Sequence, residues 1–342
     1  MIALGLLIIA IGAFCQSSCY VPINKIRSWS WESYWLMQGV FAWLVFPLLG
    51  AALAVPEGGS MWQLLADADP FMLWMTVLFG ALWGVGGLTF GLSMRYLGVA
   101  LGQSIALGTC AALGTVMGPV LLNAFFPEMD ALSSLTVSVV IGIAATLLGI
   151  AVIGAAGAMK AASLSEEEKR KAVKDFNFPK GIAIALLAGF MSGCFNIGLT
   201  FGEGICFADS QPMFATLPAT MLVTMGGFVT NAVYCFWQNS RNRTWGDYAK
   251  GGVMASNLMY CALAGLLWYS QFFGLSMGKG FIPESSSLYT LSFCILMALN
   301  VVFSNVWGII LKEWKGCSRA TIAVLLIGIC ILIISSFISQ LV

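Results

Sequence analysis

Histidine is absent from the 342 residues of this chain, and only 9% of its residues are charged. Without histidine, Ser-His-Asp hydrolysis and histidine-ligated metal sites are excluded. The nearest match to a phosphate-binding loop, Gly278-Lys279-Gly280, lacks both the earlier glycine and the following serine or threonine, so ATP hydrolysis is not expected. The sequence therefore predicts neither an enzyme nor a resident cofactor, and energy input must come from an ion gradient.

Paired cysteines are absent as well. The ten cysteines are scattered singly, mostly within apolar runs, and none forms a Cys-x-x-Cys pair. Disulfide frameworks and zinc sites need paired or regular spacing, whereas isolated cysteines in apolar runs behave as small buried residues. We expect no metal site.

Apolar residues dominate what is present: 59% of the chain is hydrophobic, and the mean hydropathy is +0.91. A membrane-spanning helix needs about 20 apolar residues. Continuous apolar runs exclude a transmembrane barrel, and the short loops leave no room for a soluble or nucleic-acid-binding domain. We expect an all-α polytopic membrane protein in the lipid bilayer, with no evident protein partner and ten transmembrane helices near residues 2–21, 34–55, 71–94, 98–123, 132–157, 181–201, 213–237, 252–277, 288–311 and 320–341.

The basic residues lie on alternate loops. The odd-numbered loops hold 15 of the 16 Lys and Arg residues, and only Lys279 lies on an even-numbered loop. The positive-inside rule places the odd loops in the cytoplasm. Both termini are then expected on the outer, periplasmic side of a bacterial inner membrane, and the longest connector, residues 158–180, is a cytoplasmic linker.

Residues 1–157 and 181–342 carry an internal repeat. The segment Phe90–Met94 is identical to Phe273–Met277 at an offset of 183, and weaker matches at offsets of 176 and 179 link the first apolar stretch to the sixth and the fifth to the tenth. Each half has an odd number of helices, so the second half must enter the membrane inverted. Inverted repeats are typical of transporters with a site near the midplane. For the small residues within the matching segments, close packing of helices is an equally good explanation.

Several segments rich in tryptophan or charge resemble a known family: Tyr20-x-Pro22, Trp29-Ser30-Trp31-Glu32, Phe79-Gly80-Ala81-Leu82-Trp83-Gly84, Met94-Arg95-Tyr96-Leu97-Gly98, Leu217-Pro218, Trp268-Tyr269-x-Gln271-Phe272-Phe273 and Leu311-Lys312-Glu313-Trp314. Over nearly its full length the chain resembles the bacterial L-rhamnose–proton symporter family, a branch of the drug/metabolite transporter superfamily. The resemblance implies two inverted five-helix repeats and proton-coupled import of a neutral 6-deoxy sugar, with L-rhamnose the first candidate, by alternating access.

Other functions stay open at this point. A sugar transporter that is coupled to Na⁺, or that is purely facilitative, fits the same inventory. An exporter of metabolites or amphipathic compounds would favour a more purely aromatic and apolar cavity, whereas the amides within these spans favour a polyol. A membrane transferase is disfavoured by the lack of histidine and of an acidic pair within any span, and a sensor by the lack of an extramembrane domain.

A deoxyhexose presents hydroxyls and an apolar face, so its site needs amides beside an aromatic platform. The spans offer such side chains, and we expect the substrate site among Gln16, Tyr20, Trp83, Gln103, Asn231, Trp268, Tyr269, Gln271, Asn300 and Asn305. Buried amides also serve as bonds between helices, which is an equally good explanation for any single one. Trp29, Trp31 and Trp35 are expected in the aromatic belt at the membrane surface.

Proton coupling needs a titratable group, and the acidic residues lie at the ends of the expected spans. Glu32, at the start of the second helix, is the first candidate, and Glu203, at the end of the sixth, is the second; the simplest alternative for each is an exposed loop acid. Arg95 and Lys279 follow the repeated Phe-Gly-Leu-Ser-Met segment and are candidate gate residues, unless they only snorkel at helix ends.

Overall fold

The computed structural model describes residues 1–97, 99–163, 178–310 and 314–338. Within these ranges all regular elements are helices, and ten segments are long and apolar enough to cross a membrane. They follow the apolar stretches of the sequence. The chain is therefore a multi-pass membrane protein.

The helices form two compact units. Unit 1 comprises Met1–Gly84 and Gly198–Phe281, and unit 2 comprises Val85–Ile197 and Ile282–Val342. Each unit therefore takes segments from both halves of the sequence.

In unit 1, α12 packs along α1 and along the continuous second span formed by α3, η1 and α4, and α11 packs against that same span. The short helix α5 lies outside the spans, between the second and the third. The elements of unit 1 are α1 (Ile2–Ser17), α2 (Tyr20–Ile23), α3 (Trp31–Gly39), η1 (Val40–Val45), α4 (Phe46–Ala52), α5 (Met61–Asp67), the first half of α6 (Pro70–Leu97), the end of α10 (Phe178–Gly202), η4 (Pro212–Phe214), α11 (Leu217–Asn242), η5 (Trp245–Ala249) and α12 (Gly251–Lys279).

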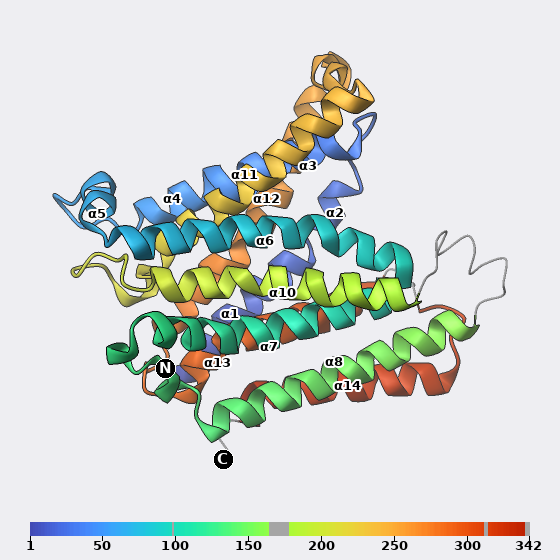
Figure 1. Cartoon of the computed structure of the whole chain (residues 1–342). Coiled ribbons are helices and arrows are strands. Elements are labelled where there is room, and N and C mark those ends of the chain that lie inside the picture. The colour runs from blue at the N-terminus through green and yellow to red at the C-terminus, as the bar shows by residue number, and fades with distance from the viewer. Residues whose placement is uncertain (98, 164–177, 311–313, 339–342) are drawn as a thin grey trace. The chain divides into compact units, whose positions relative to one another are not determined.

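In unit 2, α8 and α14 run side by side (Figure 1). Gly328 makes this approach possible, because a Cβ there would lie 2.6 Å from Ile153 Cγ1. Residues 164–177 of the predicted linker lie outside the described residues. The elements of unit 2 are the second half of α6, α7 (Val99–Phe125), η2 (Pro127–Met129), η3 (Ala131–Ser134), α8 (Val137–Ser163), most of α10, α13 (Ser287–Ile310) and α14 (Arg319–Ile338).

The second span changes helix type in its middle. Pro47 has no N–H to offer the carbonyl of Trp43 four residues earlier, and in a regular α-helix its ring would clash with that carbonyl. The chain instead forms a π-helical segment over Val40–Val45 and returns to α-helix at Phe46. Such segments occur frequently at functional sites, and this one carries Trp43.

Glycines allow α6 and α11 to approach closely. A Cβ on Gly84 would lie 2.8 Å from Gly227 O and 2.9 Å from the Cβ of Thr230. Thr230 also crosses to the facing helix, where its Oγ1 donates to Ala81 O at 2.9 Å. A backbone carbonyl cannot move aside as a flexible side chain can, so the crossing tolerates no side chain at Gly84.

Gly84→Ala is therefore expected to destabilise the protein by about 1 to 3 kcal/mol through overpacking. Gly87→Ala is the matched control on the same helix, because a Cβ at Gly87 meets nothing within 4 Å. Thermal unfolding in detergent should show a lower Tm for Gly84→Ala and an unchanged or higher Tm for Gly87→Ala. Equal Tm values for the two variants would contradict the close approach of α6 and α11.

Candidate functional site

Three tryptophan rings from three helices meet inside unit 1, and we call them the tryptophan cluster: Trp43 of η1, Trp83 of α6 and Trp268 of α12. The ring centroids of Trp43 lie 5.8 Å from those of Trp83 and 5.9 Å from those of Trp268, both edge to face, and Trp83 and Trp268 are 5.6 Å apart. These separations are those of favourable aromatic pairs. The cluster is an aromatic platform within the membrane-spanning part of unit 1.

Glycines leave room for these rings, because they have no side chain. The ring of Trp43 leans back over Gly39, where a Cβ would lie 2.6 Å from ring carbon Cε3, and the ring of Trp83 lies against Gly227 in the same way. A row of rings continues from Trp43 to Trp35 at 5.7 Å and from Trp35 to Trp31 at 5.3 Å. The aromatic surface therefore extends from the platform to the start of α3.

Polar atoms without partners lie in two of the spans that carry this cluster and in α1, which packs along α12. Within the described residues, four buried atoms of these spans make no hydrogen bond: Gln16 Oε1, Gln38 Oε1, Trp43 Nε1 and Tyr269 Oη. A buried polar group without a partner costs about 1 to 3 kcal/mol, so native proteins rarely keep several of them. Such atoms are the natural partners of a bound polar ligand.

Helix packing brings two of these groups toward the cluster. Gly12 lies against the backbone of Gln271, and α1 runs antiparallel to α12, so Gln16 lies one turn further along, toward Trp268. The Tyr269 hydroxyl reaches across to α4 and lies against Gly50, which has no side chain to block it. Polar groups from α1 and α12 therefore accompany the aromatic platform.

The other predicted ligand residues of unit 1 have different surroundings. Asn231 is satisfied: its Oδ1 accepts from Trp35 Nε1 at 3.0 Å, and its Nδ2 donates to Gly227 O at 2.9 Å. Gln271 is buried, and its Nε2 donates to Trp268 O at 3.2 Å. Tyr20 opens the short helix α2 and is 53% exposed.

The remaining predicted ligand residues belong to unit 2. Asn300 is buried within α13, and Asn305 donates from Nδ2 to Val301 O of the same helix at 2.9 Å. The side chain of Gln103 on α7 lies outside the described part of the chain. The predicted ligand set is therefore divided between the two units.

Glu32 is a buried carboxyl group, only 6% exposed, on the first turn of α3. Its Oε1 accepts hydrogen bonds from Asn242 Nδ2 at 3.0 Å and from Thr244 Oγ1 at 2.8 Å. Within the described residues it forms no ion pair. The interpretation of Glu32 as an exposed loop acid is wrong, because the end of α11 folds over it.

The end of α11 is shaped to cover Glu32. Arg243 ends the helix in the left-handed conformation with φ of 58°, and Thr244 N then donates back to Asn239 O at 3.0 Å. This six-residue closure is typical of helix C-termini. It turns the chain so that the Thr244 hydroxyl faces Glu32.

A second acid, Asp247 of η5, lies close to Glu32 but differs from it in forming an ion pair with a lysine. Lys250 Nζ donates to Asp247 Oδ1 at 2.6 Å, and Ser30 N donates to Oδ2 at 2.7 Å. Burial alone would raise the pKa of Asp247, but these hydrogen bonds lower it to about 2. Asp247 therefore stays ionised at any pH near neutrality.

The other predicted charged residues lie at the opposite end of unit 1 or outside the described side chains. Lys279 Nζ lies 3.4 Å from Glu203 Oε1, and this pair is partly exposed. It joins the end of α12 to the residue that follows α10. The side chain of Arg95 lies outside the described part of the chain.

Comparison with known proteins decides the family. A family model described as L-rhamnose-proton symport protein (RhaT) matches residues 1–342. The chain belongs to this family. A protein named L-rhamnose-proton symporter from Cronobacter sakazakii is 32% identical over 352 residues, which cover 98% of this chain and 96% of that protein. A protein of the same name from Yersinia pestis is 30% identical over 343 residues with the same coverage.

The family predicted from the tryptophan-rich motifs is thus confirmed. In this member of the L-rhamnose-proton symport family, two of those motifs meet in space, because Trp83 and Trp268 both belong to the tryptophan cluster. A third motif carries Glu32. The residues that carry the resemblance are therefore concentrated in unit 1.

Sequence reasoning missed several residues of this family member's site. Trp43 was not selected, although a tryptophan four residues before a proline in an apolar run was a usable signal. Trp29 was expected in the lipid belt, but it is 8% exposed and its ring packs edge-on against Tyr248 at 5.4 Å. Asn239 and Asn242 gave no signal, because their link to Glu32 spans more than 200 residues.

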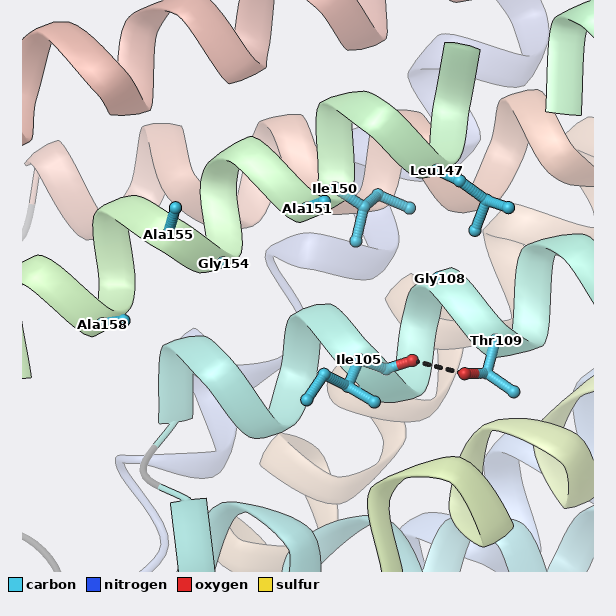
Figure 2. A pocket seen from close by; sticks show the side chains of 9 residues that line it. All are labelled: Ile105, Gly108, Thr109, Leu147, Ile150, Ala151, Gly154, Ala155 and Ala158. Atoms are coloured by element: carbon cyan, nitrogen blue, oxygen red, sulfur yellow. Dashed lines mark hydrogen bonds between the residues drawn. The ribbon is translucent and has the colours of Figure 1, made fainter. Parts of the chain in front are cut away.

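An apolar groove of about 360 Å³ lies between α7 and α8 in unit 2 (Figure 2). Its single hydroxyl, Thr109 Oγ1, already donates to Ile105 O at 2.8 Å. The remaining lining consists of Ile105, Gly108, Leu147, Ile150, Ala151, Gly154, Ala155 and Ala158. A sugar would lose its hydrogen bonds to water here and regain none from these side chains, so the groove does not suit the sugar named in the family description.

Proposed function

We propose that this chain imports L-rhamnose together with a proton across the bacterial inner membrane by alternating access, and that the sugar binds at the tryptophan cluster of unit 1. The observation that supports this proposal is the combination of three tryptophan rings with unpaired buried polar atoms on two of the same spans and on the adjoining α1. The family and the printed names of the two relatives support the sugar and the proton.

The chemistry of a 6-deoxyhexose matches these two features. Its C–H face and methyl group can stack on the indole rings, which removes apolar surface from water. Its hydroxyls can donate to Gln16 and Gln38 and accept from the indole N–H of Trp43. Each such bond relieves a buried unpaired atom, which makes binding more favourable than the same bond formed at an exposed site. The rings contact one another in the present conformation, so the sugar replaces part of that contact.

A ligand panel tests the sugar assignment. L-Rhamnose should raise the Tm of the purified protein, since a ligand that binds only the folded state at 100 times its Kd stabilises by about 2.7 kcal/mol. L-Mannose carries a hydroxymethyl group where L-rhamnose has its C6 methyl and should give a smaller shift, while L-lyxose and L-fucose test the remaining positions. No shift with L-rhamnose, combined with a shift from an amphipathic drug, would instead favour an exporter.

Glu32 is our candidate for the proton carrier, with Glu203 as the second choice. A carrier must bind and release its proton, and a buried carboxylate without a cation is better suited to this than one held in an ion pair. Glu203 is partly exposed beside Lys279, whereas Glu32 is buried among neutral donors. Lys279 and Arg95 remain gate candidates, and Gln103, Asn300 and Asn305 remain candidate ligands from unit 2.

The inverted repeat is supported by the pattern of helix contacts. If spans 1 to 5 correspond to spans 6 to 10, then α7, α8, α13 and α14 are spans 4, 5, 9 and 10. The packing of α7 on α8 then matches that of α13 on α14. The packing of α1 on α12 likewise matches that of α10 on α6, where Gly86 lies against Ser192. We infer two five-helix repeats of inverted topology in a drug/metabolite transporter fold.

Membrane orientation is tested by cysteine labelling in a cysteine-free background. We expect Gly59→Cys to react with an impermeant thiol reagent added outside and Glu166→Cys to react only after the membrane is opened, because the positive-inside rule places residue 166 in the cytoplasm. The contacts agree with one shared side for two odd-numbered loops, since Ser30 of the first loop binds Asp247 of the seventh. The reverse labelling pattern would invert the assignment of both termini.

A further inference from the structure

Five close oxygen–oxygen contacts connect Glu32 to Asp247. They run from Glu32 Oε1 to Thr244 Oγ1 at 2.8 Å, from Thr244 Oγ1 to Asn239 Oδ1 at 3.0 Å and from Asn239 Oδ1 to Ser33 Oγ at 3.0 Å. The last two lead from Ser33 Oγ to Ser30 Oγ at 2.8 Å and from Ser30 Oγ to Asp247 Oδ2 at 2.8 Å. We call these six side chains the carboxylate network.

The hydrogen bond made by Asn239 Nδ2 fixes the orientation of the Asn239 amide in this network. Asn239 Nδ2 donates to Cys235 O at 2.9 Å, and a backbone carbonyl can only accept. Turning the amide around would place two oxygens against each other at that position. Asn239 Oδ1 therefore faces Ser33 and Thr244 as an acceptor only.

With both acids ionised, the network lacks hydrogens. The hydroxyls of Ser30, Ser33 and Thr244 supply one hydrogen each, so at most three of the five contacts can be hydrogen bonds. Bonds to a charged acceptor are the stronger ones, so Ser30 donates to Asp247 and Thr244 to Glu32. Thr244 Oγ1 then meets Asn239 Oδ1 at 3.0 Å with no hydrogen between them.

A proton on Glu32 supplies one of the two missing hydrogens, the one between Thr244 and Asn239. The protonated Oε1 donates to Thr244, and the Thr244 hydroxyl turns to donate to Asn239. Oε1 still accepts from Asn242 Nδ2 at 3.0 Å. Asp247 does not serve in this role, because Lys250 and the Ser30 backbone hold it as a carboxylate.

We propose that Glu32 carries a dissociable proton and that Asn239, an acceptor, favours the protonated form. The bound proton then strengthens the link between the start of α3 and the end of α11. This inference rests on the proposed function and names the positioning residue of its proton site. Loss of the proton leaves Thr244 and Asn239 in unfavourable contact and weakens the link between the two helices. The occupancy of Glu32 is thereby coupled to closure at this end of unit 1.

The other titratable groups around Glu32 do not change this assignment. On α11 and the turn after it, Cys235, Arg241 and Arg243 are neighbours, and no ion pair joins either arginine to Glu32 within the described residues. On η5, Tyr248 donates its hydroxyl to Ser33 O at 3.1 Å, and burial raises its pKa to about 12. Asp247 with Lys250 is a closed ion pair. Glu32 is thus the acid of this cluster that no cation holds in an ion pair within the described residues.

Two substitutions at Asn239 test the proposal, with exchange of labelled L-rhamnose between equal sugar concentrations measured against pH. Asn239→Leu removes the acceptor that requires the proton, so the pH of half-maximal exchange should fall by about one unit, the equivalent of one hydrogen bond. Asn239→Asp adds negative charge and should move it upward by at least as much. Gln238→Leu removes a neighbouring amide outside the network and should leave the profile in place.

Shifts in opposite directions at one position cannot come from a merely structural role, which would lower exchange without moving its pH dependence. Unmoved profiles in both Asn239 variants, or shifts of the same sign, would overturn the proposal. If Asn239→Leu does not fold, the upward shift of Asn239→Asp decides alone, and its absence overturns the proposal. Absence of L-rhamnose exchange in the unmodified protein would reject the proposed function instead.

Discussion

Trp268→Ala and Trp43→Ala are each expected to weaken L-rhamnose binding by roughly 5- to 150-fold while the protein stays folded in detergent. Each substitution removes one ring of the tryptophan cluster, and loss of a stacking surface or a buried hydrogen-bond partner costs about 1 to 3 kcal/mol of binding, where each 1.4 kcal/mol is roughly a factor of ten. Gln271→Ala is expected to act in the same direction. Affinity is measured by calorimetry on the purified variants.

Trp62→Ala is the matched control, because Trp62 lies on α5 outside the spans and is 81% exposed. Trp43→Phe separates the two roles of Trp43, since it keeps an aromatic ring and loses the buried Nε1–H. An intermediate affinity would assign part of the binding to that N–H. Unchanged affinity in Trp268→Ala and Trp43→Ala would place the sugar elsewhere in the chain.

Glu32→Gln is expected to retain exchange of L-rhamnose and to lose sugar-driven proton movement. Glutamine resembles the protonated carboxyl in shape and charge, and its amide nitrogen can donate to Thr244 as the protonated acid does. It cannot release a proton, so net coupling stops while the binding half of the cycle continues. The measurement is a paired assay of labelled-sugar exchange and medium pH in lightly buffered vesicles.

Glu128→Gln, on the exposed turn η2, is the control for removal of a carboxylate and should behave like the unmodified protein. Glu203→Gln should retain proton movement as well, because Glu203 is partly exposed beside Lys279. Loss of coupling in Glu203→Gln with normal coupling in Glu32→Gln would transfer the proton role to Glu203 at the other end of unit 1.

The spans and the family could be read from the sequence because both depend on local composition. Twenty apolar residues specify a spanning helix wherever they occur, and motifs such as Trp268-Tyr269-x-Gln271 are recognisable without a partner. The π-helical segment was not predicted. Pro47 indicates that the regular α-helix is interrupted, but the sequence does not show which backbone conformation replaces it. Trp43 was missed for the same reason: its position inside the unit depends on that conformation.

The partners of buried polar groups could not be predicted, since they depend on which helices pack together. Asn231 and Gln16 look alike in sequence as amides within apolar spans. The structure gives Asn231 a tryptophan donor and two backbone acceptors, whereas Gln16 Oε1 has no hydrogen-bond partner within the described residues. Glu32 was placed at the start of its helix correctly, but its burial comes from α11, more than 200 residues away.

The measurement that tests the central claim most directly is the addition of L-rhamnose to lightly buffered proteoliposomes that contain only this purified chain. The account predicts that labelled sugar enters and that the medium becomes alkaline at the same time, in the absence of Na⁺, because each sugar carries a proton inward. Sugar entry that requires Na⁺ and leaves the pH of the medium unchanged would contradict proton symport.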